Sequence, residues 1–77
     1  MDISQKLVFI FMEALELPAG TDPRSVRKVN HKGWDSLAHA TLIMAIENEF
    51  DISLDIKDYD RITSFESAFL LITEKCA

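Results

Sequence analysis

The sequence predicts an all-α protein: a small four-helix bundle with three main helices, one short third helix and a long first loop. Apolar residues recur at helical spacing in three segments, which begin near residues 2, 36 and 63. Both prolines and both glycines of the chain stand in the one long stretch, residues 18–35, that keeps no such spacing. With 77 residues the chain has room for one domain, residues 1–77, with a small core.

The first helix is expected over residues 2–17. Its apolar residues follow spacings of 4, 3, 1, 3 and 1, which place them in one stripe: Ile3, Leu7, Ile10, Phe11, Ala14 and Leu15. Pro18 and Gly20 end this helix. The loop that follows is long for a small domain, and loops of this length are usually functional or disordered. We expect Val26 and Val29 to anchor it to the core.

The second helix is expected to run from Asp35 or Ser36 to Phe50. At about 100° per residue, one arc of this helix points inward: His39, Leu42, Ile43, Ile46 and Phe50. A second arc points elsewhere: Leu37, Ala40, Thr41, Met44 and Glu47. Because a small domain buries only one side of such a helix, we expect the second arc to face a partner.

A short third helix is expected over residues 55–61, anchored by Ile56 and Tyr59. The last helix is expected to begin at Thr63, whose hydroxyl would accept the backbone N–H of Glu66 while the Glu66 side chain reaches back to the Thr63 N–H. The buried stripe of this helix is expected to comprise Phe65, Ala68, Phe69 and Ile72.

The charge of the chain argues against several classes of partner. Lys and Arg number 8 against 13 Asp and Glu, which gives a net charge of -5 and a pI near 4.8. Nucleic acid and anionic membranes reward positive charge, so we expect neither as a partner. We see no signal peptide, and no apolar run near the roughly 20 residues that span a bilayer. A cytoplasmic protein is therefore expected, and a monomer.

Half of the basic residues lie in the long loop: Arg24, Arg27, Lys28 and Lys32. They are not placed as in a DNA-binding recognition helix, because they lie in a loop. Two interpretations remain open for them. They either balance the acidic surface of the rest of the chain, or they attract an anionic cofactor or partner.

Asp35 and Ser36 stand at the start of the second helix, where unpaired N–H groups and about half a positive charge suit a phosphate-bearing group. One interpretation is that either residue only caps the helix. The other is that Ser36 is modified. A nucleophilic serine would need a base and an orienting acid. The only histidines are His31 and His39, His39 lies on a different arc, and no Gly-x-Ser-x-Gly turn occurs, so no catalytic residue is expected.

No metal site is expected either. Asp55, Asp58 and Asp60 do not form a calcium loop, because the third position of that loop would be Lys57 and its sixth would not be glycine. These three carboxylates are expected to form a solvated face. Cys76 is the single cysteine, so it forms no internal disulfide, and with two scattered histidines it gives no metal-ligand spacing. We expect a free thiol there.

The Asp35-Ser36-Leu37 motif is followed by the run Met44-Ala45-Ile46-Glu47-Asn48-Glu49-Phe50-Asp51-Ile52. This pairing, in a chain of this length, resembles the second helix of acyl carrier proteins. The resemblance covers essentially the whole chain, from the first helix and long loop to the short third helix and the final one. The stretch 45–52, with Tyr59-Asp60-Arg61 after it, is also similar to D-alanyl carrier proteins of cell-wall teichoic acid modification.

The resemblance implies that Ser36, next to Asp35, is the attachment point of a 4'-phosphopantetheine arm, installed from coenzyme A by a separate phosphopantetheinyl transferase. The thiol of the arm then carries an acyl group as a thioester between acyl-loading and acyl-transferring enzymes, and the chain is not itself an enzyme. Partners of such carriers read the exposed arc of the second helix, here Leu37, Ala40, Thr41, Met44 and Glu47.

Departures from the family pattern bear on the pathway. Fatty-acid carriers are usually more acidic and place acids where this chain has Ala38 and Thr41, and a residue like Trp34 before the motif recurs in specialised carriers. These features favour a specialised fatty-acid, polyketide or lipid pathway. Two alternatives remain: an aminoacyl or D-alanyl carrier, and an unmodified helical module that docks a partner. His39, on the inward arc, is either a structural residue or a contact for the carried group.

Overall fold

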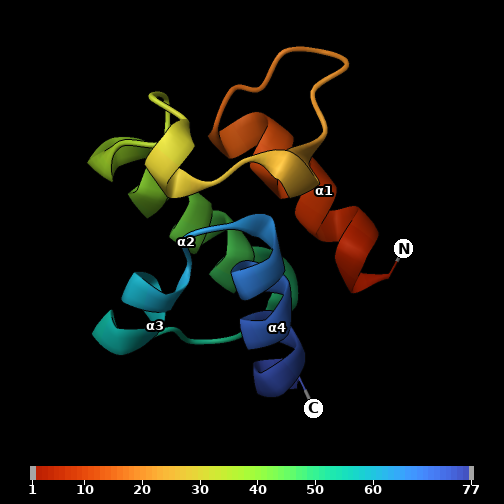
Figure 1. Cartoon of the computed structure of the whole chain (residues 1–77). Coiled ribbons are helices and arrows are strands. Elements are labelled where there is room, and N and C mark those ends of the chain that lie inside the picture. The colour runs from red at the N-terminus through yellow and green to blue at the C-terminus, as the bar shows by residue number, and fades with distance from the viewer. Residues whose placement is uncertain (1, 77) are drawn as a thin grey trace.

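Residues 2–76 are described by a computed structural model, and they fold into four α-helices and two single turns of 3-10 helix (Figure 1). In chain order these are α1 (Ile3–Ala14), η1 (Pro23–Ser25), η2 (Lys28–Asn30), α2 (Ser36–Phe50), α3 (Ile56–Arg61) and α4 (Phe65–Cys76). No strand forms within this range. The predicted all-α class is confirmed, and so is the predicted order of helices with a short third one and a long first loop.

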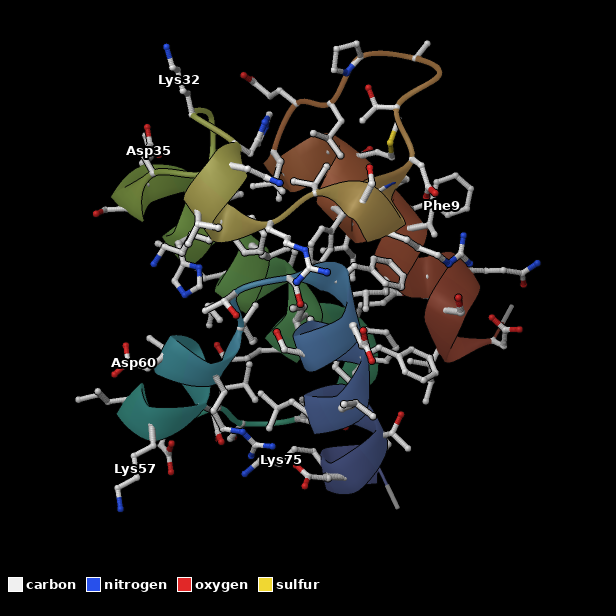
Figure 2. All side chains as sticks on the ribbon, in the orientation of Figure 1. Phe9, Lys32, Asp35, Lys57, Asp60 and Lys75 are labelled. Atoms are coloured by element: carbon white, nitrogen blue, oxygen red, sulfur yellow. The ribbon has the colours of Figure 1, made fainter. Side chains whose placement is uncertain are left out.

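The core lies between α1, α2 and α4, whose side chains fill the middle of the bundle (Figure 2). Its main buried apolar residues come from these helices and the residue after α1: Leu7, Phe11, Leu15, Leu42, Ile43, Ile46, Phe65, Ala68, Leu71 and Ile72. The predicted stripes are confirmed in part, since Leu71 is an addition and Ile3, Ile10, Ala14 and Phe69 are only half-buried against the core. His39 and Phe50 lie half-buried at the edges of the α2 arc. Phe11 packs against Phe65 with 5.3 Å between ring centroids and so joins α1 to the start of α4.

α1 is capped at its start and ends earlier than predicted. The Asp2 carboxylate accepts an N–H of the first turn. The helix stops at Ala14, not at residue 17, because Glu16 takes the left-handed conformation, with φ 51°. This turn lets the Leu17 N–H reach the Met12 carbonyl at 3.0 Å, and it returns the Leu17 side chain to the core.

The long loop is held to the bundle by its backbone, by the buried Pro23 and by two other apolar side chains. Val26 is buried, as predicted, but Val29 is 92% exposed, and its predicted role as an anchor is wrong. The loop docks there through its main chain instead, since the Lys28 N–H donates to the Thr63 carbonyl at 2.8 Å. Trp34, which is only 3% exposed, supplies the second side-chain anchor.

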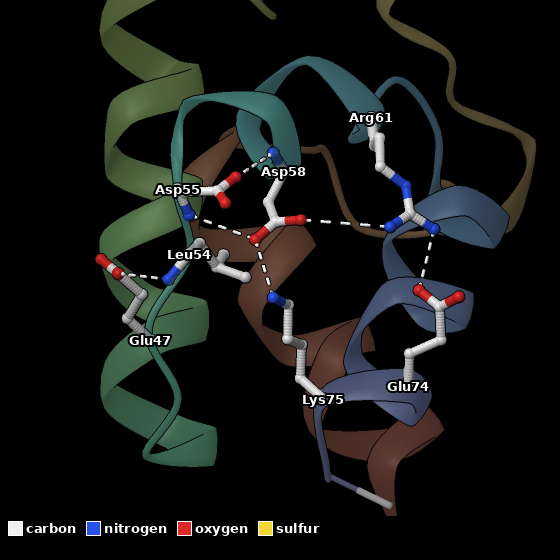
Figure 3. Close-up of polar contacts among 7 residues, drawn as sticks. All are labelled: Glu47, Leu54, Asp55, Asp58, Arg61, Glu74 and Lys75. Atoms are coloured by element: carbon white, nitrogen blue, oxygen red, sulfur yellow. Dashed lines mark hydrogen bonds and ion pairs between the residues drawn. The ribbon is translucent and has the colours of Figure 1, made fainter.

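α3 is anchored by a carboxylate and not by the predicted apolar residues. Ile56 is 78% exposed and Tyr59 is 37% exposed, so the prediction that they anchor the helix is wrong. Asp58, predicted to lie on a solvated face, is buried. Its carboxylate accepts the Asp55 N–H at 3.1 Å and pairs with Lys75 of α4 at 3.1 Å (Figure 3). α3 is therefore held by polar contacts and by the buried residues on either side of it, Leu54 and Ile62, and not by burial of the apolar residues that were predicted to anchor it.

The cap of α4 is one residue later than predicted. Ser64 Oγ accepts the Ser67 N–H at 3.1 Å, and Ser67 Oγ accepts the Ser64 N–H at 3.1 Å. The predicted capping box of Thr63 and Glu66 is therefore wrong. The Thr63 N–H, which the Glu66 side chain was predicted to accept, donates to Ser67 Oγ at 3.1 Å instead.

The ionised Asp58 carboxylate contributes stability that depends on pH. The hydrogen bond from the Asp55 N–H, and then the hydrogen bond and charge of Lys75 with the charge of Arg61, lower the Asp58 pKa below its ordinary value of 3.8, although burial opposes them. The contribution is therefore present above the pKa of the unfolded chain. It is lost as the pH falls through the lower pKa of the folded chain.

We accordingly expect the wild-type chain to be more stable than Asp58→Asn at neutral pH, with a difference that shrinks below about pH 4. Urea unfolding of both chains across this range measures the difference. Asp60→Asn is the matched control, because Asp60 is exposed on the same helix. A difference between wild type and Asp58→Asn that does not change with pH would contradict this assignment.

Candidate functional site

Asp35 builds the start of α2. Its backbone is extended (φ -95°, ψ -172°), and its Oδ1 accepts the Ala38 N–H at 2.9 Å. Asp35 is thus the cap, and Ser36 is the first residue of the helix. Ser36 is exposed, and its hydroxyl makes no hydrogen bond with any residue from 2 to 76. Of the two predicted capping residues only Asp35 caps, so the Ser36 hydroxyl is available for chemistry.

Two backbone N–H groups beside this hydroxyl are also available. In the first turn, the Ala38 N–H bonds to the cap and the His39 N–H bonds to the Asp35 carbonyl at 2.8 Å. The N–H groups of Ser36 and Leu37 find no acceptor in the part of the chain that the structure describes. Such groups, with the partial positive charge of a helix N-terminus, favour an anion bound to the Ser36 oxygen.

Trp34 ties the segment that carries Ser36 to the core. Its indole is buried and packs edge-on against Phe11, with 5.5 Å between ring centroids. Its Nε1–H donates to His39 Nδ1 at 2.9 Å, and the two rings stack with centroids 6.0 Å apart. This anchor was not predicted, although a lone tryptophan directly before the cap of α2 is a usable signal in the sequence.

A tight turn sets Trp34 in place. The Trp34 N–H donates to the His31 carbonyl at 3.1 Å. Gly33 lies within this turn, and a Cβ at that position would stand 3.1 Å from His31 Nε2. A larger residue there would have to push the His31 ring aside, so glycine at this position lets the chain turn closely before the buried indole.

His39 uses both of its ring nitrogens. Because Nδ1 accepts the Trp34 proton, the ring proton is assigned to Nε2, which donates to the Tyr59 carbonyl at 2.9 Å. These two contacts require a neutral imidazole. Neither nitrogen is left to act as a base toward Ser36. His39 is therefore a junction between the loop, α2 and α3.

The outward arc of α2 is mostly exposed and apolar. Its exposed members are Leu37, Ala40, Thr41 and Met44, with Leu37 at 77% and Met44 at 66%. Glu47 differs, because it is half-buried and its Oε2 accepts the Leu54 N–H at 3.0 Å (Figure 3). The Glu47 carboxylate thus holds the segment that leads into α3, while the rest of the arc is open to solvent.

Charged groups are sparse around Ser36. α2 has no Lys, Arg, Asp or Glu between residues 36 and 46. Among the basic residues of the loop, Arg24 is engaged at the start of α4, where its guanidinium lies 5.4 Å from the centroid of the Phe65 ring. Lys32 projects from the same corner of the molecule as Asp35 (Figure 2).

Outside the start of α2, the described residues form neither a disulfide nor a cluster of metal ligands. Cys76 is exposed and free at the end of α4. From residue 2 to residue 76, no three His, Cys, Asp or Glu side chains come together as metal ligands. No helix in that range is long and apolar enough to cross a bilayer.

Comparison with known proteins gives relatives of one kind. No protein-family model matches the chain. An acyl carrier protein of Nitratidesulfovibrio vulgaris (strain DSM 19637 / Miyazaki F) is 33% identical over 75 residues, which are 97% of this chain and 99% of the relative. A putative mitochondrial acyl carrier protein of Schizosaccharomyces pombe is 42% identical over 57 residues, 69% of this chain and 51% of the relative. The chloroplastic acyl carrier protein 3 of Hordeum vulgare is 32% identical over 71 residues, 92% of this chain and 54% of the relative.

The extent of these matches differs between the relatives. The chain spans about half the length of the plant and yeast proteins, and nearly the whole length of the bacterial one. The bacterial match runs through all four helices and the site at the start of α2. On that match, the resemblance drawn from the motif is confirmed, and the chain belongs to the acyl carrier protein family.

Proposed function

We propose that this chain carries acyl intermediates as thioesters on a 4'-phosphopantetheine arm attached to Ser36, and that it is not itself an enzyme. The observation that supports this most is the exposed Ser36 hydroxyl at the first position of α2, with the N–H groups of Ser36 and Leu37 unbonded beside it. These donors fit the phosphodiester that the arm would place there. When bound, the arm supplies the thiol that holds the acyl group.

Asp35 has a separate role in this proposal. Its carboxylate is turned to the Ala38 N–H, where it completes the cap. It thereby leaves the two remaining N–H groups of the first turn to the phosphate. The chain would act as a single carrier domain, residues 1–77, and as a cytoplasmic monomer.

The proposed partners are a phosphopantetheinyl transferase and the acyl-loading and acyl-transferring enzymes of a specialised fatty-acid, polyketide or lipid pathway. Their docking surface would be the outward arc of α2, with Leu37 and Met44 as its apolar contacts. Because α2 carries no charged side chain from residue 36 to residue 46, this contact would depend on apolar burial more than on charge.

Ser36 is expected to be the residue that accepts the arm. Incubation with coenzyme A and a broad-specificity phosphopantetheinyl transferase should add the mass of one arm to the intact protein, and Ser36→Ala should gain none. The other serines of the chain serve as internal controls. Loading of the Ser36→Ala chain at any other serine (Ser4, Ser25, Ser53, Ser64 or Ser67) would overturn the assignment. If the wild type gains no mass, the alternative of an unmodified interaction module is favoured.

Met44 is expected to matter to partners and Ile46 to folding. Met44→Ala should change the free energy of unfolding by less than about 0.5 kcal/mol and slow the loading of the arm by about fivefold or more. Ile46→Ala, at a fully buried position, should cost about 2–5 kcal/mol. Leu70→Ala is the matched control, since Leu70 is 55% exposed on α4. Equal slowing by Leu70→Ala, or unfolding by Met44→Ala, would show that the arc is placed wrongly.

A further inference from the structure

α3 is attached to its two neighbours in different ways. Toward α4 it is held by charged groups, since Lys75 Nζ lies 3.1 Å from Asp58 Oδ2 and Arg61 Nη2 lies 2.8 Å from Glu74 Oε2 (Figure 3). These groups pair along one side of the short helix. The apolar Ile56 on α3 is exposed and adds no burial to the attachment.

Toward α2 the attachment consists of single hydrogen bonds from side chains to backbone. His39 Nε2 donates to the Tyr59 carbonyl at 2.9 Å, and Glu47 Oε2 accepts the Leu54 N–H at 3.0 Å. The two tethers lie about two turns apart on α2. A neutral bond such as that of His39 shifts an opening equilibrium by only about twofold to tenfold, and a bond to a carboxylate such as Glu47 by about tenfold or more. Each tether is therefore a single bond whose loss can be measured as a change in the opening of α3.

The His39 tether is shared with the segment that carries Ser36. The same imidazole accepts the Trp34 indole proton on its other nitrogen, and Trp34 stands two residues before Ser36. A rotation that releases the Tyr59 carbonyl also moves Nδ1 relative to the indole. The two hydrogen bonds of His39 therefore form a continuous polar chain from the start of α2 to the backbone of α3.

We propose that His39 is a positioning residue that couples the placement of α3 to the placement of the Trp34–Ser36 segment, with Glu47 as a second tether on the same seam. When α3 leaves α2 while it stays on α4, His39 loses the Tyr59 carbonyl and its contact with Trp34 loosens. This role deepens the proposed function and rests on it, because the coupling links the position of α3 to the position of Ser36, the residue proposed to carry the arm.

Nuclear magnetic resonance of the unmodified chain tests the coupling. Trp34 is the one tryptophan of the sequence, so its indole N–H gives a single signal, and α3 is followed by its backbone N–H groups. In His39→Asn the side-chain oxygen stands as many bonds from Cβ as Nδ1 does, so it can still accept from Trp34 but cannot reach Tyr59. In His39→Gln the amide nitrogen takes the place of Nε2, so the Tyr59 bond is kept and the Trp34 acceptor is lost.

The decisive step is a double-mutant cycle with Glu47→Ala, which removes the second tether. In the wild-type background, Glu47→Ala should raise the exchange rates of the α3 amides and of the indole N–H by about tenfold or more, because the lost bond has a carboxylate acceptor. In the His39→Asn background it should raise only the rates of the α3 amides. Glu49→Ala is the matched control, an exposed acid on the same helix that should change neither signal.

An equal effect of Glu47→Ala on the indole in both backgrounds, or no effect in either, would overturn the proposal. If His39→Asn does not fold, His39→Gln replaces it in the cycle, because it breaks the same chain at Trp34 instead of Tyr59. The measurements need no arm on the protein. A failure of Ser36 to accept the arm would therefore contradict the proposed function but would not test the coupling. Exchange rates that show no coupling would contradict the coupling but would leave the proposed function unaffected.

Discussion

Burial of Trp34 is the constraint on which the rest of the site depends. Ordering a long irregular loop costs conformational entropy along its whole length, and few of the loop's side chains reach the core. An indole buries on the order of 200 Å², and the bond to His39 satisfies the one polar atom that it brings inside. The chain therefore enters α2 at a defined point, where Asp35 caps the helix and Ser36 faces solvent.

The side chains of α2 stabilise neighbouring segments as well as the core. Two of its polar residues, His39 and Glu47, turn toward the backbone of the neighbouring segment and hold it. Two of its large apolar residues, Leu37 and Met44, are exposed instead. A helix that served only the core would have the opposite arrangement. An exposed apolar strip next to the serine is what a carrier needs if several enzymes are to dock in turn on one small surface.

Periodicity predicted most of the fold. The apolar stripes of α1, α2 and α4 each span several turns, so the spacing of their residues alone indicated which faces are buried. The family pattern and the helix start together singled out Ser36. What the sequence did not show were contacts of short segments with distant residues.

Two of the wrong predictions have such a cause. Asp58 looked solvated because its partner, Lys75, lies far along the chain on another helix. Val29 was predicted to anchor the loop because it is apolar. The loop is held there by the backbone hydrogen bond from Lys28 to Thr63, which the types of side chain in the sequence do not indicate. The cap of α4 has a local cause instead: Thr63 and Glu66 have the spacing of a capping box, but the next pair along, Ser64 and Ser67, forms the cap.

The most direct test of the role given to Trp34 is the backbone order parameter of residues 34 to 36, measured by ¹⁵N relaxation on the unmodified chain. If the buried indole holds this segment, the N–H groups should be as ordered as those within α2, with values near 0.85. Replacement of Trp34 by alanine should lower the values at Asp35 and Ser36 more than those in the middle of α2. Values below about 0.6 for these residues in the wild-type chain would contradict the claim that Trp34 holds Ser36 in place.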